Sequence, residues 1–470
     1  MLFASFTFLF AFLPAVLIGW WLLPRSSWRV AFLALASYVF YGWWDWRYLP
    51  LLWAVTLSDF FFCHFIGRST GRRRTLGLVG ALVVDLGALG VFKYTGFFLS
   101  SLNGLGHLLG AGRPFPALHI LLPVGISFYV FSSVSCTIDV YRSRQRPPRS
   151  LLHFAAFVAM FPRLLAGPIA RYGELGPQLE RPERRLSWQM TGSGLWFLAC
   201  GMVKKLLIAD VLAPYVNSLF AHNAQLGVAS AWAAALGYTM QLYFDFSGYS
   251  DMAVGVGLLM GLRLPQNFNS PYKSASVSEF WRGWHMTLSF WMRDYLFISL
   301  GGSRGGRWRT VRNLMITMTL AGLWHGAGWT YVLWGAIWGV YLSIHTLVRR
   351  RGAQREPDAT WLRALKRAAT FIMVIVAWVP FRAPNMAVTG RVLGAMIGLN
   401  GVDSWKSLTT LVGWRLAAML GAALVFVNAA PNTWQVTLQP RKRYALAIGL
   451  LMGASILMIS HPLPFLYLQF

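Results

Sequence analysis

The sequence predicts an all-α protein that crosses a membrane several times. Of its 470 residues 56% are hydrophobic, and only 12% are charged. It also contains 23 tryptophans, 33 phenylalanines and 17 tyrosines, an excess typical of side chains that anchor helices at the two membrane interfaces. Long apolar runs follow one another along the chain and are separated by short polar segments. These patterns indicate one polytopic transmembrane domain over residues 1–470, surrounded by membrane lipids.

The net charge of +27 comes from short basic segments that lie between the apolar runs. No basic helix or RNA-binding signature is present, so nucleic acid is not expected as a partner. Under the positive-inside rule, the basic segments are predicted to be cytoplasmic and the N-terminus to lie outside. The first apolar run has no basic stretch before it and no small-residue cleavage site, so we expect a retained span. The predicted cytoplasmic segments are residues 25–29, 68–74, 142–149, 349–367 and 441–443.

A hydrocarbon core of ~30 Å requires ~20 apolar residues per helix. Residues 151–170 are apolar but are interrupted by Pro162 and Pro168 and followed by arginines, so a re-entrant element is expected there. With further spans inside 192–262 and 313–345, the total is roughly eleven spans. The other spans are predicted at residues 3–23, 29–45, 50–67, 76–98, 117–140, 368–383, 410–430 and 444–460.

Residues 243–251 are unusually polar for a lipid-facing helix, because they contain Asp245, Asp251 and several hydroxyl groups. In a helix Asp245 and Tyr249, four residues apart, share a face. Two interpretations remain open: these groups fasten helices to one another, or they line a reaction chamber.

Residues 279–297 are predicted to form one amphipathic interfacial helix. Arg282, His285, Ser289 and Arg293 recur at spacings of three and four and would form a polar stripe, opposite an apolar side rich in tryptophan. The glycine-rich residues 301–306 then predict a flexible turn. A nucleotide-binding loop is the alternative, but it lacks the Lys-Ser/Thr of a P-loop and a preceding strand.

Residues 313–345 are apolar over more than one span and are predicted to break at residues 326–328, Gly-Ala-Gly. His325 immediately precedes this break, where the missing side chains leave room for a substrate. Gly322 and Gly326 are spaced at four, as are Gly335 and Gly339, a spacing that allows close helix approach.

His285 and His325 lie within apolar segments, where an imidazole is expected to line a cavity or make a specific contact. A neutral imidazole, with a pKa near ~6.5, can take the proton of a hydroxyl that attacks an acyl thioester. The alternatives are a packing role and a zinc site, but the two histidines have no third ligand motif nearby and the three cysteines form no CxxC pair. The remaining histidines are predicted near span ends or loops: His64, His107, His119, His153, His222, His345 and His461.

Eight motifs together suggest a family. They lie at residues 36–41, 92–94, 122–129, 165–168, 241–251, 267–272, 279–300 and 322–327. By these motifs the chain resembles the membrane-bound O-acyltransferase family, in particular its bacterial branch that acetylates exopolysaccharides such as alginate. The resemblance extends over most of the sequence, and Arg163 departs from the neutral or weakly basic residue expected at its position.

The resemblance implies a ring of about eleven helices, with re-entrant and interfacial pieces, around a central chamber. By this resemblance His325 corresponds to the family's catalytic histidine and His285 to its second histidine. Asp245, Tyr249, Asp251, Asn269, Arg282 and Trp324 are the expected chamber-lining residues.

The implied reaction is O-acetylation of an extracytoplasmic polysaccharide of the alginate or cellulose type at the bacterial inner membrane. The donor would be acetyl-CoA or a carrier-protein thioester, with no tightly bound cofactor or metal, and a periplasmic acetyltransferase would be a partner. Teichoic acid alanylation or a lipid acceptor remain alternatives, as do a transporter and a non-catalytic scaffold of a polysaccharide synthase.

Overall fold

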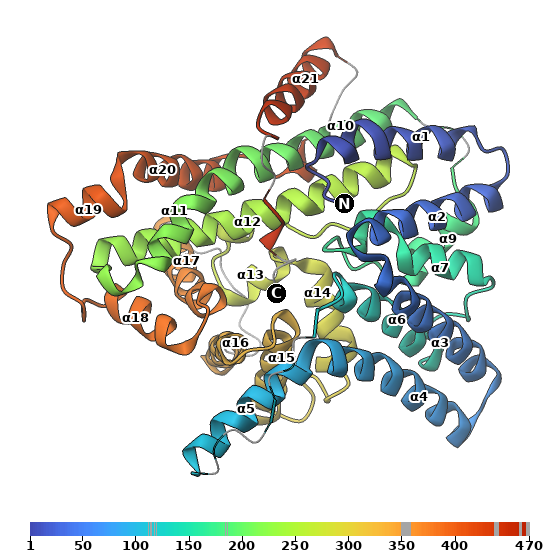
Figure 1. Ribbon diagram of the computed structural model, residues 1–470, viewed down its shortest axis with the longest axis horizontal. Coiled ribbons are helices and arrows are strands. Elements are labelled where there is room, and N and C mark those ends of the chain that lie inside the picture. Colours follow the sequence, from blue (N-terminus) through green and yellow to red (C-terminus); the bar gives the residue numbers. More distant parts are fainter. Residues whose placement is uncertain are drawn as a thin grey trace. The chain divides into compact units, whose positions relative to one another are not determined.

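The computed structural model describes the whole chain except residues 111, 113, 114, 117, 119, 184, 186, 349–358, 437–440, 460–462 and 467–470. The regular elements within these residues are helices, as the composition predicts (Figure 1). The chain divides into two compact units, Met1–Leu195 with Ala253–Pro265, and Trp196–Met252 with Gln266–Phe470. His119, His461 and much of the predicted basic segment 349–367 lie outside the described residues.

The first unit contains the predicted N-terminal spans. Its helices α2, α3, α4, α6 and α7 pack against one another, with α3 contacting α4, α6 and α7. The predicted spans 29–45 and 50–67 end within a few residues of α2 and α3, which a short 3-10 turn separates. Its helices are α1 (Leu13–Leu22), α2 (Ser26–Asp45), α3 (Leu49–Arg68), α4 (Gly71–Leu89), α5 (Thr95–Leu108), α6 (Ile126–Tyr141), α7 (Leu151–Ala159), α8 (Phe161–Leu164) and α9 (Tyr172–Glu180).

The predicted interruption of residues 151–170 is present. Helix α7 ends at Ala159, Met160 adopts a non-helical conformation, and the short α8 precedes a turn at Gly167. Arg163 is buried within this broken segment. Its guanidinium donates to Ser132 Oγ at 2.6 Å and to the Phe157 carbonyl, and it lies over the Phe157 ring, 4.2 Å from the centroid. The broken backbone is therefore covered by protein, as such a segment at membrane depth requires.

The second unit contains both histidines of interest. Helices α10 (Trp188–Met202) and α12 (Val228–Leu259) belong partly to each unit. The other helices of the second unit are α11 (Asp210–Ala221), α13 (Val277–Gly283), α14 (Met286–Trp291), α15 (Arg307–His325), α16 (Trp329–Val348), α17 (Thr360–Arg382), α18 (Met386–Met396), α19 (Trp405–Leu411), α20 (Gly413–Ala429) and α21 (Lys442–Leu457).

Helices α15 and α16 pack against each other more extensively than any other pair in the unit. Glycines make this approach possible, since a Cβ on Gly322 would lie 2.2 Å from the Tyr331 carbonyl oxygen and one on Gly335 would lie 2.3 Å from that of Met318. The prediction that this glycine spacing allows close helix approach is confirmed. The predicted break is confirmed as well, because α15 ends at His325 and α16 begins at Trp329.

The single amphipathic helix predicted over residues 279–297 is wrong. The segment is split into α13, α14 and a π-helical stretch at Met292–Phe297, and His285 adopts a left-handed conformation with φ of 42°. The chain at 267–269 crosses the split through two backbone hydrogen bonds. The main-chain N–H of Asn269 donates to the main-chain carbonyl of Gly283, and that of Met286 donates to the main-chain carbonyl of Asn267, both at 2.8 Å. These bonds replace bonds that a continuous helix would make, so His285 is buried while Arg282 and Arg293 are exposed.

Four helical stretches in the described part of the chain are long and apolar enough to span a membrane, and the bent pair α19 and α20 adds a fifth if counted as one span. The multi-pass helical fold is confirmed. The count of roughly eleven spans stays a prediction, since several predicted spans are shorter or interrupted helices. The four stretches are Ser26–Arg68, Gly71–Leu108, Trp329–Val348 and Thr360–Arg382.

Candidate active site

His325 is the last residue of α15 and is 4% exposed. Its ring is surrounded by aromatic side chains, with centroids 4.9 Å from Trp324, 5.0 Å from Trp334 and 5.2 Å from Phe381. The following Gly326 is required by packing, because a Cβ there would lie 2.2 Å from Cε2 of Tyr331. The helix break thus places an imidazole at a helix end, where the aromatic rings hold its orientation.

His285 lies in the split between α13 and α14 and is fully buried. Its Nδ1 is 3.0 Å from Oδ1 of Asn267, and its ring stands edge-on to Phe246 of α12, with centroids 4.7 Å apart. A Cβ on Gly283 would lie 2.8 Å from the Asn269 carbonyl oxygen, so the crossing chain fits only against glycine. Backbone contacts with residues 267–269 therefore determine the position of His285. The continuous helix predicted from the periodicity does not.

Trp324 joins the two histidines. Its ring centroid is 4.9 Å from that of His325 and 6.2 Å from that of His285. Residues 40 positions apart in the sequence therefore lie one indole ring from each other. Trp324 was expected to line a chamber, and its ring lies near both candidate catalytic groups.

A cluster of large aromatic side chains lies beside His325. Trp334, Trp338 and Trp378 are fully buried, and their indole N–H groups have no hydrogen-bond partner among the described residues. These donors are buried, so a hydrogen bond to a bound molecule here is stronger than in water. The remaining members of the cluster are Tyr272, Phe280, Trp281, Trp284 and Phe381.

Asp245 belongs to a buried ion-pair cluster. Its Oδ1 is 2.7 Å from Nζ of Lys205, which also lies 2.8 Å from Asp210, and its Oδ2 accepts from the Leu466 amide at 2.9 Å. Tyr249 shares its helix face, as predicted, and contacts Phe465 with ring centroids 4.5 Å apart. These contacts fasten α12 to neighbouring segments, which is the first of the two interpretations of these residues.

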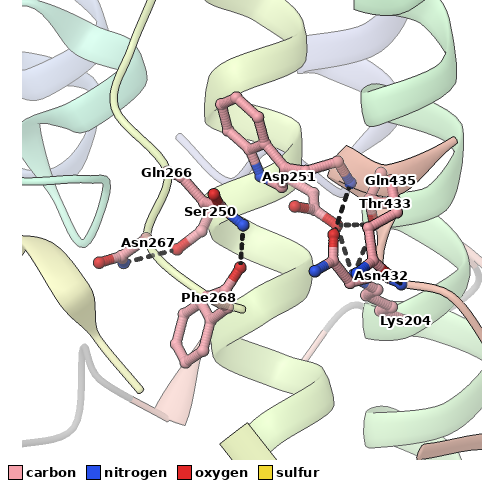
Figure 2. A network of polar contacts seen from close by, with 10 residues as sticks. Lys204, Ser250, Asp251, Gln266, Asn267, Phe268, Asn432, Thr433 and Gln435 are labelled. Atoms are coloured by element: carbon pink, nitrogen blue, oxygen red, sulfur yellow. Dashed lines mark hydrogen bonds and ion pairs between the residues drawn. The ribbon is translucent and has the colours of Figure 1, made fainter. Parts of the chain in front are cut away.

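Asp251 and Asn269 bind the segment between α20 and α21. Asp251 Oδ2 is 2.5 Å from Nζ of Lys204 and accepts from Thr433 Oγ1 at 2.7 Å, as Figure 2 shows. Oδ1 of Asn269 accepts from Nδ2 of Asn432 at 2.8 Å. Asp245, Asp251 and Asn269 bind neighbouring segments, and Arg282 is exposed, so the chamber-lining role of these residues stays a prediction.

Asn267 was not among the predicted site residues, although it lies in a motif that carried the family resemblance. It is 1% exposed, and its side chain contacts His285, Thr287 and Ser250. Trp334, Phe381 and Phe246 were missed as well. Only contacts between distant segments reveal these residues. Among the described residues, no three His, Cys, Asp or Glu side chains gather as metal ligands would.

The sequence is similar to those of known membrane-bound acyltransferases. A sequence profile described as MBOAT, membrane-bound O-acyltransferase family, matches residues 96–389. The chain is 47% identical to a probable alginate O-acetylase of Azotobacter vinelandii, over 84% of this chain and 78% of that protein. It is 41% identical to a probable alginate O-acetylase of Pseudomonas putida over the full length of both. A peptidoglycan O-acetyltransferase of Helicobacter pylori is 37% identical over 86% of this chain and 81% of its own length.

Proposed function

The chain belongs to the membrane-bound O-acyltransferase family, and we propose that it moves an acetyl group from a cytoplasmic thioester across the membrane for O-acetylation of an extracytoplasmic polysaccharide. Its similarity to O-acetylases identifies it as a multi-pass membrane O-acetyltransferase. The acetyl donor, the direction of transfer and the partner protein are the parts that we propose. One observation carries the assignment of the site: His325 and His285 lie on one indole ring within a buried aromatic cluster.

In the proposed reaction His325 is the general base. Its neutral ring takes the proton of the acceptor hydroxyl as the oxygen attacks the thioester carbonyl. A tetrahedral intermediate forms, the carbon–sulfur bond breaks, and the thiolate recovers the proton to leave as a thiol. The products are the acetyl ester and the free thiol, so protons balance and no cofactor is consumed.

The burial of His325 supports this role. At 4% exposure, and with three aromatic rings around it, the ring is held in one orientation and bulk water is kept from competing with the acceptor. We assign His285 to the acceptor, which it orients by binding a hydroxyl other than the one that His325 deprotonates. A group that only packed helices together would not require two imidazoles at one indole.

Acetyl-CoA is the proposed donor, with a carrier-protein thioester as the alternative, and the bacterial inner membrane is the proposed location. The direct acceptor is either the polysaccharide or a periplasmic acetyltransferase that passes the acetyl group on. The two relatives named as alginate O-acetylases favour a polysaccharide of that type. The relative named as a peptidoglycan O-acetyltransferase favours a second candidate function, acetylation of peptidoglycan.

The acetyl ester content of secreted polysaccharide and of purified peptidoglycan tests the proposal in cells that lack the natural gene. Wild type, His325→Ala and His222→Ala would be expressed at equal membrane levels, confirmed by blot. His222 is an exposed histidine at the end of α11 and serves as the control. We expect wild type and His222→Ala to restore esters on one of the two polymers and His325→Ala to restore none. Normal esters with His325→Ala would reject the catalytic role.

A further inference from the structure

The side chain of Asn267 makes four contacts in the site. Its Oδ1 lies 3.0 Å from Nδ1 of His285, 2.8 Å from Oγ1 of Thr287 and 3.4 Å from the Thr287 amide nitrogen. Its Nδ2 lies 2.9 Å from Oγ of Ser250, a contact that Figure 2 shows beside α12. All of these groups are buried away from bulk water, so they satisfy one another's hydrogen bonds.

The Thr287 amide fixes which way the Asn267 amide points. A backbone N–H can only donate, so the Asn267 atom that faces it must be the carbonyl oxygen. The reversed orientation would set the NH2 group against this N–H, two donors with no acceptor between them. With the oxygen toward Thr287, the NH2 group faces the Ser250 hydroxyl, which accepts.

An amide oxygen carries no proton, so the hydrogen between Asn267 and His285 must belong to the histidine. Nδ1 of His285 is therefore the protonated nitrogen, and in the neutral ring Nε2 holds the lone pair. The backbone of Asn267 is fixed as well, since its main-chain carbonyl accepts from the main-chain N–H of Met286 at 2.8 Å. The same crossing segment that splits α13 from α14 thus delivers the amide that faces the His285 ring.

We propose that Asn267 is a positioning residue that holds His285 in the Nδ1–H tautomer, so that Nε2 accepts a hydrogen bond from a hydroxyl of the acceptor other than the one that His325 deprotonates. This inference rests on the proposed function, which gives His285 the acceptor. It assigns the ring nitrogen that receives the hydroxyl and explains why a buried asparagine lies behind a histidine. In the opposite tautomer Nε2 would be a donor and would repel the hydroxyl hydrogen.

A purely structural role for Asn267, holding the split between the helices, is the competing explanation. Asn267→Asp separates the two, because a carboxylate still accepts from His285 and Thr287 but adds a negative charge behind the imidazole. That charge favours the protonated ring, so the neutral ring is available only at higher pH. The charged groups of α12 do not interfere, since Asp245 is paired with Lys205 and Asp251 with Lys204.

The test measures acetyl transfer against pH in membranes that contain wild type, Asn267→Asp, Asn267→Leu or the control Asn428→Asp. Asn428 is an exposed residue of α20. For Asn267→Asp we expect the acidic limb of the kcat profile to move to higher pH by about 1 unit or more. For Asn267→Leu we expect kcat to fall about 10- to 100-fold. The control should match wild type in both measurements.

A profile of Asn267→Asp that superimposes on wild type would overturn the inference, as would full activity of Asn267→Leu. If Asn267→Leu does not accumulate, the pH profile of Asn267→Asp, which keeps the accepted bonds, decides alone. His285→Ala and His325→Ala in the same membranes separate the two levels. If both are inactive while Asn267→Asp behaves as wild type, only the tautomer assignment fails, whereas full activity of both would reject the proposed function itself.

Discussion

Gly326→Ala should impair catalysis through a chain of ring contacts that ends at His325. The new Cβ would lie 2.2 Å from Cε2 of Tyr331, whereas carbon atoms settle near ~3.5 Å, so the Tyr331 ring must retreat by about 1 Å. Tyr331 stands edge-on to Phe381 at 5.2 Å, and Phe381 stands edge-on to His325 at 5.2 Å. The backbone of Gly326 is extended, with φ of −158°, so alanine adds no backbone strain.

The expected magnitude follows from these contacts. Overpacking of this size costs about 1–3 kcal/mol in the free energy of unfolding. A displacement of about 1 Å at a catalytic group can reduce turnover about 100-fold. Gly328→Ala is the matched control within the same break, because its nearest contact, to Cδ2 of Tyr331, would be an ordinary 3.5 Å.

Thermal unfolding in detergent and acetyl transfer in membranes would be measured for both alanine variants. We expect Gly326→Ala to lose both stability and turnover and Gly328→Ala to resemble wild type. Equal behaviour of the two variants would show that the Tyr331 and Phe381 rings do not control the position of His325, and the argument from packing would be refuted.

Two further substitutions probe other polar contacts. Lys205→Met should lower the free energy of unfolding by about 3–5 kcal/mol, because it leaves the carboxylates of Asp245 and Asp210 without their shared cation. An unchanged melting temperature of the detergent-solubilised Lys205→Met variant would contradict this expected loss of stability. Partial burial raises the pKa of Asp403, but hydrogen bonds from the Ser230 hydroxyl and from nearby backbone amides outweigh it and hold that pKa below its usual value. The stabilisation from Asp403 is therefore present above pH ~4 and disappears as pH falls through the lowered pKa of the folded state. Asp403→Asn should be less stable than wild type at pH 7, and melting curves against pH should show the difference shrinking below pH ~4; a constant difference would disprove the linkage.

Sequence patterns predicted those parts of the fold that local residues determine. The break after His325 follows from Gly326 and Gly328, and the interruption before Arg163 follows from its neighbouring prolines. Apolar run lengths predicted α2 and α3 to within a few residues. In each case the deciding residues lie next to the feature in the sequence.

The position of His285 could not be predicted in this way. Helical periodicity continues through residues 279–297, so the sequence predicts one helix, yet backbone bonds from Asn267 and Asn269 split it. Backbone hydrogen bonds of this kind leave no recognisable pattern in the sequence, because the main chain of almost any residue can donate or accept them. The adjacent Lys204 and Lys205 illustrate the same limit, since they pair with Asp251 and Asp245 at different turns of α12.

The central claim is that His325 performs acetyl transfer from a thioester donor. Its most direct test is the rate at which membrane vesicles with wild type, His325→Ala or His222→Ala transfer radiolabelled acetyl from acetyl-CoA to the acceptor polymer. We predict that His222→Ala matches wild type and that His325→Ala is slower by about 100-fold or more, the contribution of a general base. Transfer by His325→Ala at the wild-type rate would contradict the account.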